Sequence, residues 1–382
     1  MNRKIFISLF FLFLYCKSKD EINNNLYNYI PSDTVLVIKV NNHNTINNVI
    51  KNNPIISSLK FLDKTLFKTI DEISSNEISS PALFCFTPYG KNKMAVTIIN
   101  KSVPKDSLKN SNKKYSIYNG EKISEIKSKQ NQYFKSRIKN IEFISNSKLI
   151  LENSIRLVQN NTKGVQSKDF FNLAKYLDSN SPINILIKYN AHNFFKNIFL
   201  EMPLFPLMGE SWSSYDLNLR IEPLAFDGIH FINDSIPNNL TFIKDLDPKE
   251  TFSENIIPQN FTSLLIIPVD NFEILETNFI KYSRHKNLAI KKIDFKTFNL
   301  INEISWINYM DENAVFLHLK SDDNLNDILY EEKKIFKEFR DIKIIKKTLP
   351  HDFLNFSSNF IKSLDLNFSS KIDDFIVYSE SE

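Results

Sequence analysis

The sequence contains very few glycines, and this shortage excludes several kinds of catalytic and nucleotide-binding site. Only 5 of the 382 residues are glycine. Phosphate-binding loops, dinucleotide-binding loops and nucleophile elbows need glycine where the backbone takes a positive φ or approaches a ligand closely. None of the glycines falls at the spacing of these motifs. We therefore expect neither a nucleotide-binding protein nor an α/β-hydrolase.

The sequence also lacks clustered metal ligands. Its 6 histidines stand singly, without the HExxH spacing of a zinc protease. The segment 322–333 begins like a calcium-binding loop, but Asp327 stands where glycine is needed and Lys333 where a bidentate glutamate is needed. A helix N-terminus explains these acidic residues better. We therefore predict no metal site and no cofactor.

Neither sign of charge is in clear excess. The chain has 48 basic and 44 acidic residues, which give a formal net charge of +4. Proteins that bind nucleic acid usually carry a strongly basic patch or stripe, and no such stretch stands out along this chain. We therefore expect no nucleic-acid partner.

The N-terminus carries a short export signal. Arg3 and Lys4 precede an apolar run from Ile5 to Tyr15, which Cys16 closes. The run is too short for a membrane-spanning helix, which needs about 20 apolar residues, and it has the charged-then-apolar order of a signal peptide. A cysteine in this place resembles a bacterial lipoprotein signal, which implies palmitate or another fatty acyl chain on Cys16. The alternative is an ordinary signal peptide or an uncleaved anchor in which Cys16 is incidental.

A group of three residues that follows this cysteine in the chain resembles a tag for surface export. Lys19, Asp20 and Glu21 place a basic residue before two acids, an order that resembles the export tag of surface-displayed lipoproteins in Bacteroidetes. The other interpretation is a solvated polar tether. We therefore expect a lipid-anchored protein of the outer membrane, on either its cell-surface or its periplasmic face.

The remaining cysteine is predicted to be inert. Cys85 lies in the apolar, strand-like run Ala82–Phe86. A reactive thiol needs a partly exposed, electropositive setting, whereas a buried thiol behaves as a small apolar side chain. With Cys16 assigned to lipid, no intramolecular disulfide can form.

Internal repetition is the strongest structural signal in the sequence. Ile38–Ile50 aligns without a gap with Ile187–Phe199, and the two segments share Ile, Lys, His and three Asn. Two further pairs of segments match more loosely: Ile30-Pro31 with Ile257-Pro258, and Phe134–Ser147 with Phe368–Ser381. Repeated supersecondary units indicate a scaffold and do not point to a reaction.

Hydrophobic periodicity predicts both strands and helices. Continuous or alternating apolar residues predict strands, and apolar residues three or four apart predict helices. The predicted strands are 34–40, 82–86, 94–99, 141–145, 148–151, 183–189, 217–221, 229–232, 262–267, 303–309 and 314–319. The predicted helices are 54–73, 154–158, 170–177, 272–279 and 325–339. Together they predict an α+β fold, with antiparallel sheets and packed helices in two long repeated units around a shorter middle unit.

These elements also predict the domain boundaries. The predicted segments are a lipoprotein signal peptide at 1–16, a polar tether at 17–29, a first α+β unit at 30–163, a shorter middle unit at 164–244, a linker at 245–255 and a second long unit at 256–382. The second long unit stops where the first continues into a predicted strand and helix. We therefore expect it to lack both elements and to leave a sheet edge unpaired.

One aromatic pair is a candidate for contact with a partner. Trp212 and Tyr215 follow the apolar loop 202–208. Exposed apolar patches mark interaction sites, so these two residues are a candidate contact patch. The interpretation that we favour is burial inside the middle unit.

Several of these segments together resemble a known group of proteins. The two Ile-Pro openings, the segment Phe143–Ser147 and the segment Trp212–Leu217 resemble an uncharacterised family of flavobacterial lipoproteins, over nearly the whole mature chain. The resemblance implies a location and a style of fold, with longer members continuing into further domains. It implies no catalytic residue.

We therefore predict a lipid-anchored protein of the outer membrane or cell surface that acts as a non-enzymatic binding or scaffold module. Its expected partners are the membrane, through the N-terminal lipid, and another envelope protein. One alternative is an envelope hydrolase with an unrecognised site between units. Another is a carrier for an apolar ligand, which the 33 phenylalanines would suit.

Overall fold

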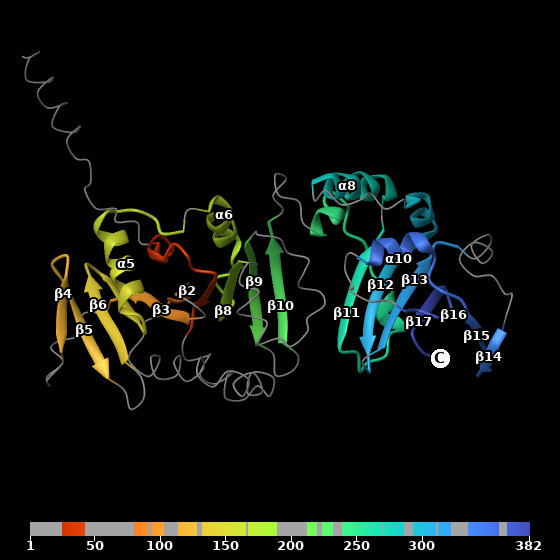
Figure 1. The fold of residues 1–382 in the computed structure, drawn as a ribbon, viewed down its shortest axis with the longest axis horizontal. Helices are drawn as coiled ribbons and strands as arrows, with labels where there is room; N and C mark the ends of the chain where they lie inside the picture. Colours follow the sequence, from red (N-terminus) through yellow and green to blue (C-terminus); the bar gives the residue numbers. More distant parts are fainter. Residues whose placement is uncertain are drawn as a thin grey trace, which may run out of the picture. The chain divides into compact units, whose positions relative to one another are not determined.

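The described part of the chain forms two compact units, each built on one antiparallel sheet (Figure 1). The first unit comprises Met1–Ile198 and Trp212–Phe231, and the second comprises Phe199–Ser211 and Ile232–Glu382. The computed structural model describes residues 25–42, 80–90, 93–102, 114–127, 132–165, 167–188, 212–219, 224–231, 239–269, 271–285, 293–310, 312–321, 335–358 and 365–382.

The first unit contains a ten-stranded sheet in its described residues. Its strands are β1 (Leu36–Val40), β2 (Ala82–Tyr89), β3 (Lys93–Lys101), β4 (Tyr115–Tyr118), β5 (Glu121–Lys127), β6 (Gln132–Ile138), β7 (Ile141–Ser145), β8 (Ile183–Lys188), β9 (Trp212–Leu219) and β10 (Leu224–His230). The strand order is β10-β9-β8-β1-β2-β3-β7-β6-β5-β4. A short 3₁₀ helix, η1 (Leu26–Tyr29), precedes β1, and the helices α5 (Lys148–Gln159) and α6 (Lys168–Tyr176) follow β7.

The second unit contains a seven-stranded sheet in its described residues. Its strands are β11 (Ser263–Pro268), β12 (Ile301–Tyr309), β13 (Glu312–Leu319), β14 (Ile335–Phe339), β15 (Ile342–Lys346), β16 (Phe368–Ile372) and β17 (Phe375–Ser379), in the order β11-β12-β13-β17-β16-β15-β14. Its helices are α8 (Phe272–His285) and α10 (His351–Ser357), with short 3₁₀ helices η4 (Asn239–Ile243), η5 (Ser253–Asn255) and η6 (Phe295–Leu300).

The two sheets share one strand order. The run β1-β2-β3-β7-β6-β5-β4 of the first sheet has the same connectivity as the whole of the second sheet. The matched segments that begin at Phe134 and Phe368 fall on β6–β7 and on β16–β17, and the turns between these strands place Lys139 and Asp373 at φ of 55° and 48°. Three additional strands, β8, β9 and β10, extend the first sheet beyond β1.

The prediction of an α+β fold is wrong, because the structure is mostly β. The sequence patterns do not predict β4, β5, β14 and β15. β5 is mostly lysine, serine and glutamate, and β4, β14 and β15 are only four or five residues long, too short for periodicity to distinguish a strand from a helix. The end of the predicted helix 325–339 is wrong, because residues 335–339 form β14 and pair with β15. The strands of the expected middle unit are likewise hydrogen-bonded into the first sheet, through the antiparallel pair of β8 with β1.

The predicted strand 148–151 is also wrong, because these residues begin the helix α5. Ser147 is the N-cap, and its hydroxyl accepts a hydrogen bond from the backbone N–H of Ile150 at 3.5 Å. The buried residues Ile150, Leu151, Ile155 and Val158 then follow at helical spacing. A short apolar run does not distinguish a strand from the buried face of a helix.

The sheet edge expected at the end of the second unit is not formed by β17. This strand pairs with β13 on one side and with β16 on the other. The segment 245–255, expected to be a linker, includes η5, whose Ser253 is fully buried.

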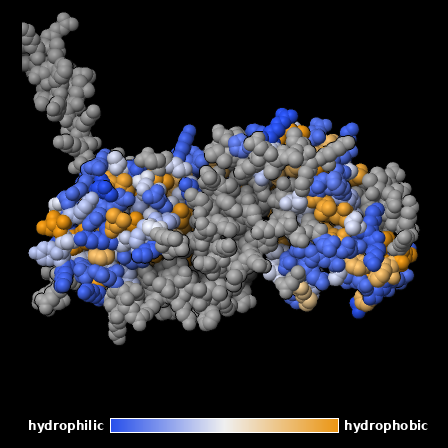
Figure 2. Space-filling model, in the orientation of Figure 1, coloured by the Kyte–Doolittle hydropathy of each residue, from blue (hydrophilic) through white to orange (hydrophobic). Residues whose placement is uncertain are grey.

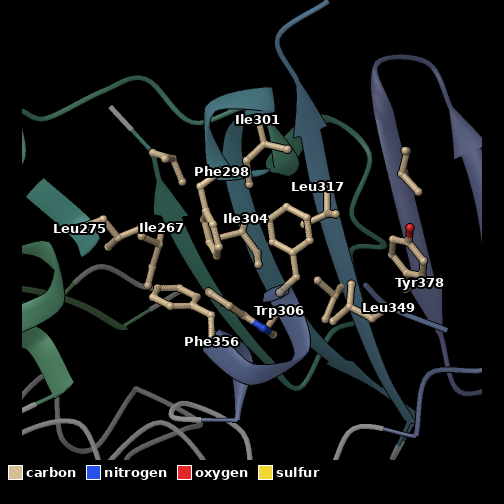
Figure 3. Close-up of a cluster of buried hydrophobic side chains, with 14 of the residues drawn as sticks. Ile267, Leu275, Phe298, Ile301, Ile304, Trp306, Leu317, Leu349, Phe356 and Tyr378 are labelled. Atoms are coloured by element: carbon tan, nitrogen blue, oxygen red, sulfur yellow. The ribbon is translucent and has the colours of Figure 1, made fainter. Parts of the chain in front are cut away.

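An aromatic core fills one face of the second sheet (Figure 3). Phe356 of α10 lies against Trp306 of β12, with ring centroids 6.3 Å apart, and against Phe298 of η6 at 5.0 Å. All three side chains are buried. These buried phenylalanines therefore pack between the sheet and the helices α10 and η6.

Candidate functional site

Each sheet ends in an edge strand that exposes large apolar side chains. On β4, Tyr115 is 62% exposed and Ile117 is 70% exposed. On β14, Ile335, Phe336 and Phe339 are 51%, 49% and 56% exposed. Figure 2 shows hydrophobic surface over β4 in the first unit and over β14 and β15 in the second. Because exposed apolar groups that lie together mark interaction sites, we take these two edges as the candidate functional site.

Both edge strands belong to tight hairpins of the same kind. The two-residue turn of the β4–β5 hairpin is Asn119-Gly120, with φ of 46° and 81°, and the turn of the β14–β15 hairpin is Arg340-Asp341, with φ of 49° and 66°. Positive φ at both residues defines the turn that matches the twist of two antiparallel strands. The two hairpins occupy the last positions of their sheets.

Basic side chains lie against the exposed rings of both hairpins. The Nζ atom of Lys122 lies 4.3 Å from the ring centroid of Tyr115. In the β14–β15 hairpin, the guanidinium of Arg340 lies 5.2 Å from the ring of Phe339, and the Nζ atom of Lys346 lies 5.3 Å from the ring of Phe336. These cation–ring contacts hold the aromatic side chains on the surface in defined places.

A second candidate is a buried polar cluster on β12. The carboxylate of Glu303 is fully buried and accepts hydrogen bonds from the backbone N–H groups of Phe252 at 2.7 Å and Ser253 at 3.0 Å. The hydroxyl of Ser253 also donates to Glu303 and contacts the hydroxyl of Ser305. The carboxylate therefore ties the segment before β11 to the middle of the sheet, since breaking these bonds would leave buried N–H groups without acceptors.

His318 lies beside this cluster, opposite Glu303 in the β12–β13 pair. Its ring is between those of Phe252 and Phe375, at centroid distances of 4.4 and 4.6 Å. Burial lowers the pKa of His318, while the nearby charges of Glu303 and Asp374 oppose that shift. Its Nδ1 atom has no hydrogen-bond partner. His318 therefore does not act through Nδ1 as a base toward Ser253.

The first unit carries apolar residues at the corresponding places. Leu83 and Ile99 form the cross-strand pair that corresponds to Glu303 and His318, because both pairs lie equally far from the turn that ends their hairpin. Both Leu83 and Ile99 are buried in an apolar cluster. The shared fold thus does not require the polar cluster, which belongs to the second unit alone among the described residues.

A shallow hollow of about 370 Å³ opens next to the polar cluster. It is lined by Lys249, Glu250, Phe252, Val269, Asn302 and Lys320. Its charged residues carry both signs, and Lys320 already donates to the Asn299 side chain at 3.2 Å. The hollow shows no preference for one class of ligand.

A serine and a histidine meet in the first unit, a pair that the sequence did not reveal. The hydroxyl of Ser213 on β9 lies 2.7 Å from Nδ1 of His230 on β10, its cross-strand neighbour. Burial lowers the pKa of His230 from 6.5 to about 4, so the ring is neutral at neutral pH. Ser213 is only 1% exposed. Its hydroxyl cannot meet a substrate in this position, so the pair is part of the packing of the sheet.

Of the site residues predicted from the sequence, some lie outside the described part of the chain and others are buried. The lipidation site Cys16 and the export tag Lys19, Asp20 and Glu21 lie outside the described residues. Trp212 is 3% exposed and packs edge-on against Phe170 with ring centroids 4.8 Å apart, so it does not contribute to an exposed contact patch.

Tyr215 is half-buried, and an added Cβ at its cross-strand neighbour Gly228 would lie 2.4 Å from the Tyr215 ring. Glycine at this position lets the ring cross the neighbouring strand. The burial predicted for Cys85 is confirmed, since it is a free, fully buried cysteine whose pKa is raised by burial.

Within the described ranges, no group of three or more His, Cys, Asp or Glu side chains could hold a metal ion. The segment 322–333, which resembles part of a calcium-binding loop, lies outside those ranges. None of the helices in the described part of the chain is long and apolar enough to cross a membrane.

Comparisons with known proteins place few limits on the function. No family model matches the sequence, and no curated protein matches it. The chain is similar to the solved structure of TP0453 in its crystal form I, at 10% sequence identity, with 95% of this chain and 94% of that chain covered and a TM-score of 0.28. At this TM-score the likeness carries no argument about fold or function.

Proposed function

We propose that this chain is a lipid-anchored protein of the outer membrane, related to the flavobacterial lipoproteins that it resembles, and that it acts as a non-enzymatic binding or scaffold module. The observation that carries the binding role is the pair of edge hairpins, β4–β5 and β14–β15. They hold equivalent places in two sheets of the same strand order, and both expose large apolar side chains. Surfaces of this kind are used to bind other proteins.

The proposed anchor is a diacylated cysteine at position 16. Arg3 and Lys4, the apolar run and Cys16 supply the order of a lipoprotein signal. Each buried methylene of an acyl chain contributes about 0.8 kcal/mol, so two or three chains hold a protein stably where one chain does not. A tethered body would then meet its partners at the membrane surface.

Partitioning in Triton X-114 tests the anchor. We expect the wild-type chain, expressed in a bacterium that processes lipoproteins, to enter the detergent phase, and Cys16→Ala to stay in the aqueous phase. Cys85→Ala is the matched control, because it removes the other cysteine and should leave partitioning unchanged. A wild-type chain in the aqueous phase, or a detergent-phase Cys16→Ala variant, would contradict the proposed anchor.

Capture from solubilised outer membranes tests the binding role. The tagged wild-type chain should retain at least one envelope protein in a fixed ratio, and replacing the exposed apolar residues of both hairpins by serine should release it. A wild-type chain that retains no partner would contradict the binding role. Protease treatment of intact cells would show whether the body faces outward.

A further inference from the structure

We propose that the outer edge of β14 binds an extended, acidic segment of a partner protein as an added strand. This inference rests on the proposed binding function and names the site and the chemistry of the partner. Three independent features of the β14–β15 hairpin carry it: its open backbone, its exposed aromatic side chains and its charge.

The backbone of β14 offers hydrogen bonds on its outer side. β14 is the last strand of its sheet and pairs only with β15 among the described strands. Phe339 and Ile342 flank the two-residue turn, and residues in that position bond to each other. Because bonded and non-bonded pairs alternate in an antiparallel ladder, the N–H and C=O of the preceding residue, Glu338, point outward. The pairing of β14 with β15 shifts register between Ile335 and Lys337, so the regular part of the edge is Lys337–Phe339. An extended peptide can pair with the outward groups of Glu338 at the centre of this part.

The side chains around this edge are exposed but held in place. All five residues of β14 are exposed. Phe339 carries the guanidinium of Arg340 over its ring, and Phe336 lies between Lys346 and Phe368, whose ring centroid is 5.6 Å away. Apolar side chains that are already ordered lose little entropy on binding, which favours a specific contact.

The charge of the hairpin indicates an acidic partner. Residues 335–347 contain five basic side chains and two acidic ones; the basic residues are Lys337, Arg340, Lys343, Lys346 and Lys347, and the acidic residues are Glu338 and Asp341. One of the basic groups, Lys337, already pairs with Glu382 at 2.8 Å, and the hairpin keeps a basic excess when this acid is included. Complementary charge favours one partner and disfavours others.

The same features disfavour two other occupants. A second copy pairing β14 with β14 would bring two basic hairpins together, and like charges at close range are destabilising. A lipid surface would cover the apolar rings but would leave the outward N–H and C=O groups without hydrogen bonds, which is costly. A peptide strand can form hydrogen bonds with the outward N–H and C=O groups and can also cover the exposed apolar rings.

A peptide-binding assay with the full chain tests the proposal. The probe is a short fluorescein-labelled peptide in which valine alternates with glutamate, and the control probe alternates valine with lysine. By fluorescence anisotropy we expect the glutamate peptide to bind at least about tenfold more tightly than the lysine peptide. Phe336→Ser with Phe339→Ser should weaken binding of the glutamate peptide about tenfold. The matched control is Phe261→Ser with Met310→Ser, which removes two exposed apolar side chains outside both hairpins and should leave binding unchanged.

A proline substitution tests whether the peptide binds through backbone hydrogen bonds or only through contacts with the exposed side chains. Glu338→Pro removes the outward N–H, and edge strands tolerate proline when the lost N–H faces away from the sheet. Glu338→Ala removes the same charge and keeps the N–H, so it should bind the acidic peptide at least as well as the wild type. Equal binding by the proline and alanine variants, with unchanged circular dichroism, would overturn strand addition. Equal binding of the two peptides, or no binding of either, would overturn the acidic partner.

The same variants distinguish a failure of this inference from a failure of the proposed function. If the wild-type chain captures an envelope partner and the Glu338→Pro variant captures it equally well, the binding role stands and the β14 site is wrong. If the wild-type chain captures no partner, the binding role itself is wrong.

Discussion

At the scale of single residues, His230 makes the stability of the first unit depend on pH. Burial lowers its pKa from 6.5 to about 4. The unfolded chain therefore takes up a proton near pH 6.5, but the folded chain takes it up only near pH 4. Protonation in this window favours the unfolded state, so stability is complete above about pH 6.5 and falls as the pH decreases toward 4.

We predict that His230→Gln flattens this pH dependence. Each unit of pKa shift corresponds to about 1.4 kcal/mol, so His230 accounts for at most about 3 kcal/mol between pH 7 and pH 4. Urea unfolding at several pH values, followed by circular dichroism, measures the slope. His285→Gln is the control, because this exposed residue lies in the second unit, and it should leave the pH slope of the first unit in place. An unchanged slope in His230→Gln would show that other groups cause the dependence.

At the scale of elements, the two edge hairpins have the same turn geometry with different residues. Asn119-Gly120 suits positive φ, whereas Arg340 adopts it at a cost, since the left-handed region costs residues other than Gly, Asn and Asp about 1–2 kcal/mol. We predict that Arg340→Asn with Asp341→Gly stabilises the β14–β15 hairpin by about 1 kcal/mol. Hydrogen exchange of the hairpin amides, measured by mass spectrometry, should slow accordingly.

The reverse exchange in the first unit is the matched test of this turn prediction. Asn119→Arg with Gly120→Asp should speed exchange in the β4–β5 hairpin. An added Cβ at Gly120 meets no atom within 4 Å, so a loss of protection would report the backbone conformation and not a clash. Unchanged exchange in both swapped hairpins would contradict the argument.

At the scale of the whole molecule, each unit has its own buried core, and we predict that the two units unfold in separate transitions. Phe143 in the first unit and Phe356 in the second are both fully buried. Replacing either by alanine should cost about 3–5 kcal/mol, and each variant should lower a different transition in calorimetry. A single transition that both variants lower would show that the units unfold together.

Many of the buried strands could be predicted from the sequence, since a continuous apolar run becomes buried regardless of which elements pack against it. Cys85 and Ile144 lie in such runs, and both are buried in strands. The edge strands could not be predicted in the same way. Ile117 and Phe336 are apolar, yet both are exposed, because exposure depends on whether another strand or helix covers that position.

The sequence by itself determined which residues are apolar enough to form the core, and that Phe134–Ser147 resembles Phe368–Ser381. It also determined that the glycines do not have the spacing of nucleotide-binding loops or nucleophile elbows, and that Cys85 lies in an apolar run. Only the tertiary structure decided that β4 and β14 lie at sheet edges, that residues 148–151 begin a helix, and that Trp212 is buried. The physical reason is that periodicity records how one segment meets its surroundings, whereas strand order and edge exposure depend on pairing between segments far apart in the chain.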